Sequence, residues 1–287
     1  MKKHIWITAL MSILLITTAS SCKNQKASIP HETVDTNEIY LPDDQKQIID
    51  RIKNSLEKIS TKSKRAKILY EFFNEHAILA RYMSDGRVVI ITQPKNSIDF
   101  FVAIDPFPKK FEKTVALATF SCEPLPVMSL TNYNGSSFAD GIMLAHELSH
   151  AEDCVYRGEP NSNPLSPIWL HGELNAHRSI ATILSEYTGG KYKNIVLDSS
   201  KRRAQILRDS GKRPYSFVMG NPAGDEEAIV QVFGKQDDLT TNFLLTQLSV
   251  DANIANIINH FKNDSEAIDQ VVLEFLGTFY NRHLQNI

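Results

Sequence analysis

A short motif in the middle of the chain has the residue types and the spacing of a metal site. Residues 146–150 read HELSH, which places His146 and His150 four positions apart with Glu147 between them. On a helix, residues at this spacing lie about 40° apart around the axis and about 6 Å apart along it, so both imidazoles project from one side. Two neutral imidazoles so placed can bind one zinc ion, and Glu147 can hold a water molecule beside the metal and take its proton. The motif therefore predicts a zinc site with Glu147 as the catalytic base.

A carboxylate on the next predicted helix offers the further protein ligand that a catalytic zinc site needs. This helix is expected to begin at Ser166-Pro167, a favourable cap and first residue, and Glu173 lies in the middle of its apolar stripe. Burying a lone carboxylate costs several kcal/mol unless the group is paired or coordinates a metal. We therefore expect Glu173 to be the third zinc ligand.

Other polar residues on these two helices stay open as ligands. His177 lies one turn after Glu173 on the same stripe, so it is the alternative third ligand, with Glu173 then supporting it through a hydrogen bond. His171 lies on a different side of the helix and is a weaker option. Asp153 shares the face of the two motif histidines, where we expect it to make a polar contact near the site.

Together the two helices resemble the gluzincin branch of the zincin metallopeptidases. The resemblance rests on HELSH followed, 23 residues after its second histidine, by Glu173 on a second helix, and it covers roughly residues 114–185. It implies that both motif histidines and Glu173 bind zinc and that Glu147 is the general base. The family also tends to place an edge strand before the motif helix, against which a peptide substrate lies, and the candidate here is TVALATFS (114–121).

Three positions depart from the zincin pattern. Glu152 stands two positions after the motif, where these peptidases usually have a hydrophobic residue. His177 stands four positions after the glutamate ligand, where thermolysin-like members have an aspartate that supports the first histidine. Tyr156 stands where the metzincin branch has its third histidine. The second departure leaves the third ligand open between Glu173 and His177.

The elements around the motif predict an α+β fold that is mostly helical. Short runs rich in β-branched and aromatic residues predict a small antiparallel sheet before the ligand helices, with strands at 87–92, 98–104, 114–121 and 126–130. Periodic apolar residues predict helices. The first has its start signal at Pro42-Asp43-Asp44, and the others span 63–82, 138–157, 167–188, 195–210, 224–234, 238–261 and 265–284. This grouping of elements indicates segregated α+β rather than alternating units. Residues 41–287 are therefore expected to form a single zincin-like domain whose C-terminal helices provide structural packing.

The sequence leaves the role of three tyrosines and the pairing of two cysteines open. Tyr133, Tyr187 and Tyr215 could each stabilise an oxyanion, as a tyrosine often does in such enzymes, and the sequence does not choose among them. Cys122 and Cys154 could form a disulfide in an exported protein. Their separation in space is not set by the sequence, so the bridge stays open.

The N-terminus has the pattern of an export signal. Residues 1–21 contain two lysines, a short apolar run and a small-residue exit, which predicts a signal peptide too short to span a bilayer comfortably. Cys22 follows directly and resembles the lipidated cysteine of a bacterial lipobox, although Ala19 stands where leucine is usual. We expect lipidation at Cys22 and a polar tether over 22–40, the alternative being an ordinary secretory signal. The expected location is the cell envelope, in the outer membrane facing the periplasm.

The charge of the chain gives no sign of a nucleic-acid partner. The formal net charge is −2, and loss of Lys2 and Lys3 with the signal peptide takes it to −4. A nucleic-acid-binding face would show as a strongly basic patch or stripe.

These expectations combine into a zinc-dependent peptidase of the bacterial cell envelope that hydrolyses peptide bonds in a peptide or protein substrate. The alternative is a lipid-anchored, catalytically inactive zincin-like binding or assembly protein. A third hypothesis is that the histidines bind no metal and that their helix is structural, against which the apolar setting of Glu173 argues. The sequence sets neither the substrate nor the oligomeric state.

Overall fold

The computed structural model describes most of the chain after residue 42, with short gaps: 43–82, 88–90, 94–105, 110–111, 114–115, 118–122, 126–130, 137–157, 165–262 and 264–284. The predicted signal peptide (1–21), the predicted lipidation site Cys22, the predicted tether (22–40) and Tyr133 lie outside the described residues. Among the helices of the described ranges, none combines the length and the apolarity needed to cross a bilayer.

Helices dominate the described part of the chain, which confirms the predicted mostly helical α+β class. The helices are α1 (Asp43–Ser60), α2 (Lys64–His76), α3 (Ser137–Arg157), α4 (Pro167–Tyr187), α5 (Lys191–Asp209), α6 (Asp225–Phe233), α7 (Asp238–Phe261) and α8 (Ser265–Leu284). The strands are β1 (Ala77–Tyr82), β2 (Val88–Ile90), β3 (Phe100–Ile104), β4 (Lys110–Phe111), β5 (Thr114–Val115), β6 (Ala118–Ser121) and β7 (Val127–Leu130). The strands precede the two ligand helices, as predicted.

The main sheet is mixed, so the prediction of an antiparallel sheet is wrong in this respect. Its order is β2-β1-β3-β7-β6. The central strands β1, β3 and β7 run parallel, whereas the edge strands β2 and β6 pair antiparallel with β1 and β7. Along the chain, β2 lies between β1 and β3, and β4, β5 and β6 lie between β3 and β7. Strand periodicity predicts that a segment is extended, but it does not predict pairing direction.

The predicted helix over 63–82 is also wrong in its second half. Helix α2 begins after Ser63, whose hydroxyl accepts a hydrogen bond from the backbone N–H of Ala66, and it ends at His76. Strand β1 follows without an intervening turn and pairs with both β2 and β3. No glycine or proline marks this boundary in the sequence. The long-range pairing, rather than local propensity, decides the conformation of residues 77–82.

Helix α3 occupies the centre of the fold because it packs against α1, α2, α4 and α7 as well as the edge strand β6. One contact with α1 is especially close: a Cβ at Gly141 would lie 2.8 Å from the backbone carbonyl oxygen of Ser55. Glycine therefore permits this approach of α3 to α1. One face of the sheet joins the same core, through Phe100, Val102, Ile104, Met128 and Leu130.

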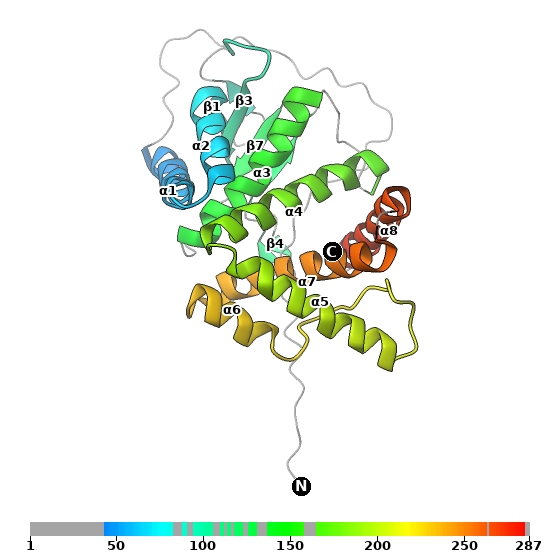
Figure 1. Cartoon of the computed structure of the whole chain (residues 1–287). Coiled ribbons are helices and arrows are strands. Elements are labelled where there is room, and N and C mark those ends of the chain that lie inside the picture. Colours follow the sequence, from blue (N-terminus) through cyan, green and yellow to red (C-terminus); the bar gives the residue numbers. More distant parts are fainter. Residues whose placement is uncertain are drawn as a thin grey trace.

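Helix α4 connects the two halves of the molecule. It lies between the half that contains the sheet, α1, α2 and α3, and the half that contains α5, α6 and α7 (Figure 1). Near its N-terminus, α4 packs on α7 and α8 around the fully buried Trp169. The C-terminal helices therefore contact the same helix that carries Glu173.

Candidate metal centre

The structure brings His146, His150 and Glu173 together inside the protein. The two histidine Nε2 atoms lie 3.1 Å apart. Glu173 Oε2 lies 3.6 Å from Nε2 of His146, and Glu173 Oε1 lies 3.5 Å from Nε2 of His150. These residues form a group whose ligand atoms all lie within 4.8 Å of one another. The arrangement can hold a metal ion.

The spacing of these atoms fits zinc. Nitrogen and oxygen ligands at about 2.0–2.2 Å from a tetrahedral zinc ion lie about 3.3–3.5 Å from one another. The separations of 3.1 Å between the two histidine nitrogens and 3.5 Å between His150 and Glu173 Oε1 lie close to that range, and the other Glu173 oxygen lies 3.6 Å from His146. The donor set of two imidazoles and a carboxylate is also one that catalytic zinc sites use. The residues present therefore fit a zinc ion with three protein ligands.

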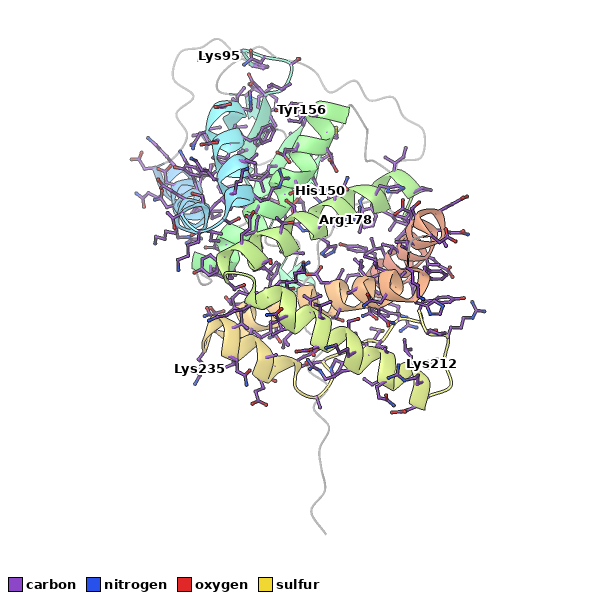
Figure 2. The ribbon with its side chains drawn as sticks, in the orientation of Figure 1. Lys95, His150, Tyr156, Arg178, Lys212 and Lys235 are labelled. Carbon is purple, nitrogen blue, oxygen red and sulfur yellow. A yellow bond between two sulfur atoms is a disulfide. The ribbon has the colours of Figure 1, made fainter. Side chains whose placement is uncertain are left out.

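The two ligand helices hold these groups in place from opposite sides. His146 and His150 lie one turn apart on α3, and Glu173 lies on α4, which packs against α3. Figure 2 labels His150 on α3 and Arg178 on α4, where the two helices lie near each other. As predicted, α4 has Ser166 as its N-cap and Pro167 in its first turn, and the Ser166 hydroxyl accepts a hydrogen bond from the backbone N–H of Trp169.

Burial keeps the motif histidines neutral. It lowers the pKa of His146 to about 3 and that of His150 to about 4, although the Glu173 carboxylate partly offsets the effect at His150. At neutral pH both imidazoles therefore present unprotonated nitrogen, which is the form that binds a metal. Glu147 is also buried, and its pKa is raised well above the ordinary value, first by burial and then by the nearby Glu173.

A tyrosine that the sequence did not single out reaches the same cluster from α8. The Tyr280 hydroxyl donates a hydrogen bond of 2.5 Å to Glu173 Oε2 and lies 2.8 Å from Nε2 of His177. Burial raises its pKa well above the usual value, and the Glu173 carboxylate adds to the effect. A usable signal was present: Tyr280 lies on the apolar stripe of α8, and a buried tyrosine needs a partner for its hydroxyl.

His177 does not join the group of possible ligands. Its Nε2 faces the Tyr280 hydroxyl, and its Nδ1 lies 2.9 Å from Gln247 Oε1 on α7. Both ring nitrogens are therefore engaged, and neither is left for a metal. His171 is exposed, and Asp153 accepts a hydrogen bond of 3.0 Å from the Asn175 side chain. Of the two candidates for the third ligand, the geometry favours Glu173.

The remaining sequence candidates have other surroundings. Glu152, which departs from the zincin pattern, forms an ion pair with Arg65 of α2, so its charge is matched across the helix contact. Tyr187 packs against Phe138, and Tyr215 packs against His260 and Phe261. None of these contacts involves the cluster of His146, His150 and Glu173.

A disulfide joins the end of the edge strand to the motif helix. Cys122, directly after β6, is bonded to Cys154, one turn after His150 on α3. This bond settles the pairing that the sequence left open. It ties β6 to the helix that carries the two motif histidines.

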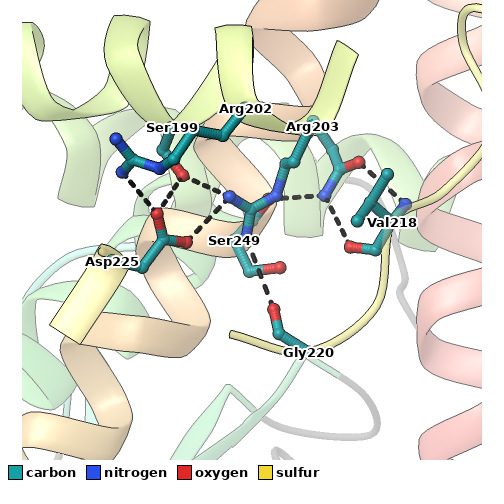
Figure 3. Close-up of polar contacts among 8 residues, drawn as sticks. Ser199, Arg202, Arg203, Val218, Gly220, Asp225 and Ser249 are labelled. Carbon is teal, nitrogen blue, oxygen red and sulfur yellow. Dashed lines mark hydrogen bonds and ion pairs between the residues drawn. The ribbon is translucent and has the colours of Figure 1, made fainter. Parts of the chain in front are cut away.

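A second buried charged cluster lies between α5 and α6. Asp225 accepts hydrogen bonds from the guanidinium groups of Arg202 and Arg203 and from the Ser199 hydroxyl (Figure 3). Arg203 is fully buried and also donates to the backbone carbonyl of Gly220. Here each carboxylate oxygen faces a cationic side chain, so the charges are matched within the cluster.

Comparison of the chain with protein-family models, with curated proteins and with solved structures gives no match. The candidate metal site is therefore supported by the arrangement of its residues alone.

Proposed function

We propose that the protein is a zinc-dependent peptidase of the bacterial cell envelope. The single observation that carries the proposal is the convergence of His146, His150 and Glu173 at separations that suit zinc. Zinc bound there would polarise a scissile carbonyl and lower the pKa of a water molecule to about 7. The rest of the chemistry falls to side chains of the protein.

Glu147 is the proposed residue that moves the proton. It lies between the two histidines on α3, on a helix held from several sides. Burial raises the pKa of Glu147, and a divalent cation beside it would oppose that effect by favouring the ionised form. In the proposed reaction the carboxylate takes a proton from the attacking water and delivers it to the leaving amine. His146, His150 and Glu173 hold the metal and take no proton themselves.

The edge strand β6 is the proposed place for the substrate backbone. It is the last strand of the sheet as described, and it packs against α3. An extended peptide can add to such an edge through main-chain hydrogen bonds, which favours peptides over small molecules as substrates. The Cys122–Cys154 bond keeps this edge beside the motif helix.

The same disulfide supports an envelope location. Disulfides form and persist mainly outside the reducing cytosol, and the predicted signal peptide leads to the same compartment. We propose that Cys22 carries a lipid that anchors the protein in the outer membrane, facing the periplasm.

The second candidate function is that of a catalytically inactive binding or assembly protein with a zincin-like scaffold. The observation that favours it is the depth of the site: Glu147 is 2% and His146 is 3% exposed. Such a protein would keep the metal site for stability alone.

Replacing Glu147 with glutamine separates these two functions. In the zinc-loaded full-length chain, Glu147→Gln should lower hydrolysis of a mixed peptide library by about 10²–10⁴-fold, because the general base is lost, while zinc content is kept. Glu152→Gln, on the same helix but paired with Arg65, is the matched control and should hydrolyse like the parent. Equal hydrolysis by Glu147→Gln and the parent would contradict the mechanism. Zinc binding with no hydrolysis by the parent would favour the inactive scaffold.

A further inference from the structure

The Glu173 carboxylate is held by a chain of buried polar side chains from the C-terminal helices. Tyr280 on α8 donates to Glu173 Oε2 at 2.5 Å, and the same hydroxyl lies 2.8 Å from His177 Nε2. His177 Nδ1 lies 2.9 Å from Gln247 Oε1. These hydrogen-bonded side chains thus lie, in order, on α4, α8, α4 and α7.

The chain continues from Gln247 to a second buried carboxylate. Gln247 Nε2 donates to Asp251 Oδ1 at 2.9 Å, and the Tyr192 hydroxyl of α5 donates to Asp251 Oδ2 at 2.8 Å. Gln247 and Asp251 lie one turn apart on α7. All of these side chains are buried, so water does not compete for their hydrogen bonds.

Gln247 contacts both the backbone and the ring of His177. Its amide nitrogen donates to Asp251 Oδ1 and to the backbone carbonyl of His177. Its carbonyl oxygen lies 2.9 Å from Nδ1 of the His177 ring, whose Nε2 lies 2.8 Å from the Tyr280 hydroxyl. The ring cannot rotate without losing both contacts, so it restricts the position of the phenol oxygen beside Glu173.

We propose that Tyr280 is a positioning residue for the metal centre, and that His177 and Gln247 hold Tyr280 in place. This inference rests on the zinc site proposed above and deepens it. Tyr280 engages Glu173 Oε2 and so restricts the orientation of the whole carboxylate, whose Oε1 lies 3.5 Å from His150 Nε2. Partners of this kind orient ligands, and their loss typically costs about 10–100-fold in metal affinity.

The proposal gives the C-terminal helices a role that the sequence did not suggest. Helix α8 packs on α4 through an apolar stripe, and the Tyr280 ring lies edge-on to Trp169 with centroids 4.8 Å apart. Packing alone would be served equally well by phenylalanine. The hydroxyl is what reaches Glu173, so Tyr280→Phe removes the proposed function and keeps the ring.

The test is zinc affinity of the full-length chain, measured by competition with a chromogenic chelator. We expect Tyr280→Phe to weaken zinc binding by about 10–100-fold. Gln247→Met removes the contact one step further from Glu173, on a different helix, so it should weaken zinc binding in the same direction but by less than Tyr280→Phe. Tyr215→Phe removes a tyrosine hydroxyl that is not part of the hydrogen-bonded series from Glu173 to Asp251, so this variant should bind zinc like the parent. The melting temperature of each protein in chelator reports folding separately from affinity.

The visible spectrum of the cobalt-loaded protein is the second readout. Its bands report the ligands around the metal, so they should shift in Tyr280→Phe and stay unchanged in Tyr215→Phe. Parent-like zinc affinity in Tyr280→Phe would overturn the inference while the zinc site stands. Weakened affinity without hydrolysis by the parent would support the inference and refute the peptidase. No zinc binding by the parent would refute both.

Discussion

Two buried polar clusters in this protein differ in how their charges are matched. In the cluster between α5 and α6, Asp225 faces two guanidinium groups and a hydroxyl, so the chain itself supplies every partner. In the cluster between α3 and α4, Glu173 faces two imidazoles that burial keeps neutral, with Glu147 close by. Among the described residues, no lysine or arginine forms an ion pair with Glu173.

The comparison separates a structural cluster from a site that suits a cation. A buried carboxylate whose charge is matched by guanidinium groups holds helices together and needs no further group. Two unprotonated nitrogens and a carboxylate at metal-ligand spacing instead present acceptors to one another, and a divalent cation satisfies all of them at once. Burial and hydrogen-bond partners, rather than charge alone, therefore assign different roles to the two clusters.

The largest expected effect comes from breaking the matched cluster. Asp225→Asn keeps the shape of the side chain but leaves the fully buried Arg203 without its counter-charge. We expect the free energy of unfolding to fall by about 3–5 kcal/mol, measured by urea denaturation. The control is Asp198→Asn, whose exposed pair with Lys201 should leave the free energy of unfolding close to that of the parent. Equal losses in the two variants would mean that burial of the Asp225 cluster is not stabilising.

The matching substitution in the other cluster should behave differently. In chelator, Glu173→Gln should leave unfolding free energy within about 1 kcal/mol of the parent, because replacing a buried charge that lacks a cationic partner is often neutral or stabilising. In zinc at about 100 times its dissociation constant, the parent should gain about 2.7 kcal/mol and the variant much less. A large loss for Glu173→Gln in chelator would show that the two clusters are alike and that Glu173 is a structural ion-pair partner.

The smallest expected effect on stability concerns Asp251, the last side chain in the hydrogen-bonded series that starts at Glu173. Burial raises the pKa of this carboxyl to about 7, although hydrogen bonds from Gln247 and Tyr192 partly offset it. The folded protein therefore binds a proton that the unfolded chain, with its ordinary carboxyl pKa, has already lost, so stability falls as pH rises towards and through 7. Between pH 6 and pH 8 we expect a loss of about 1 kcal/mol that Asp251→Asn lacks. Thermal unfolding of both proteins in chelator measures the difference, and parallel pH profiles would contradict it.

Much of the candidate site could be predicted because it depends on local spacing. The interval of four between His146 and His150 fixes their common side of a helix, and Glu173 stood out as a carboxylate on an apolar stripe. The cap at Ser166-Pro167 gave the start of α4. Each of these inferences uses residues within one or two helices.

The parts that could not be predicted depend on residues far apart in the chain. Tyr280 lies 107 positions from Glu173, and nothing local places its hydroxyl there. The pairing of Cys122 with Cys154 and the parallel direction of the central strands likewise depend on how distant segments meet. The end of α2 at His76 is set by strand pairing of the residues that follow, which local propensity does not report.

The measurement that tests the central claim most directly is the zinc content of the purified full-length chain after reconstitution and dialysis, beside Glu173→Ala. The account predicts about one zinc ion per chain in the parent and little in Glu173→Ala. No zinc in the reconstituted parent would contradict the metal centre and leave HELSH as part of a structural helix.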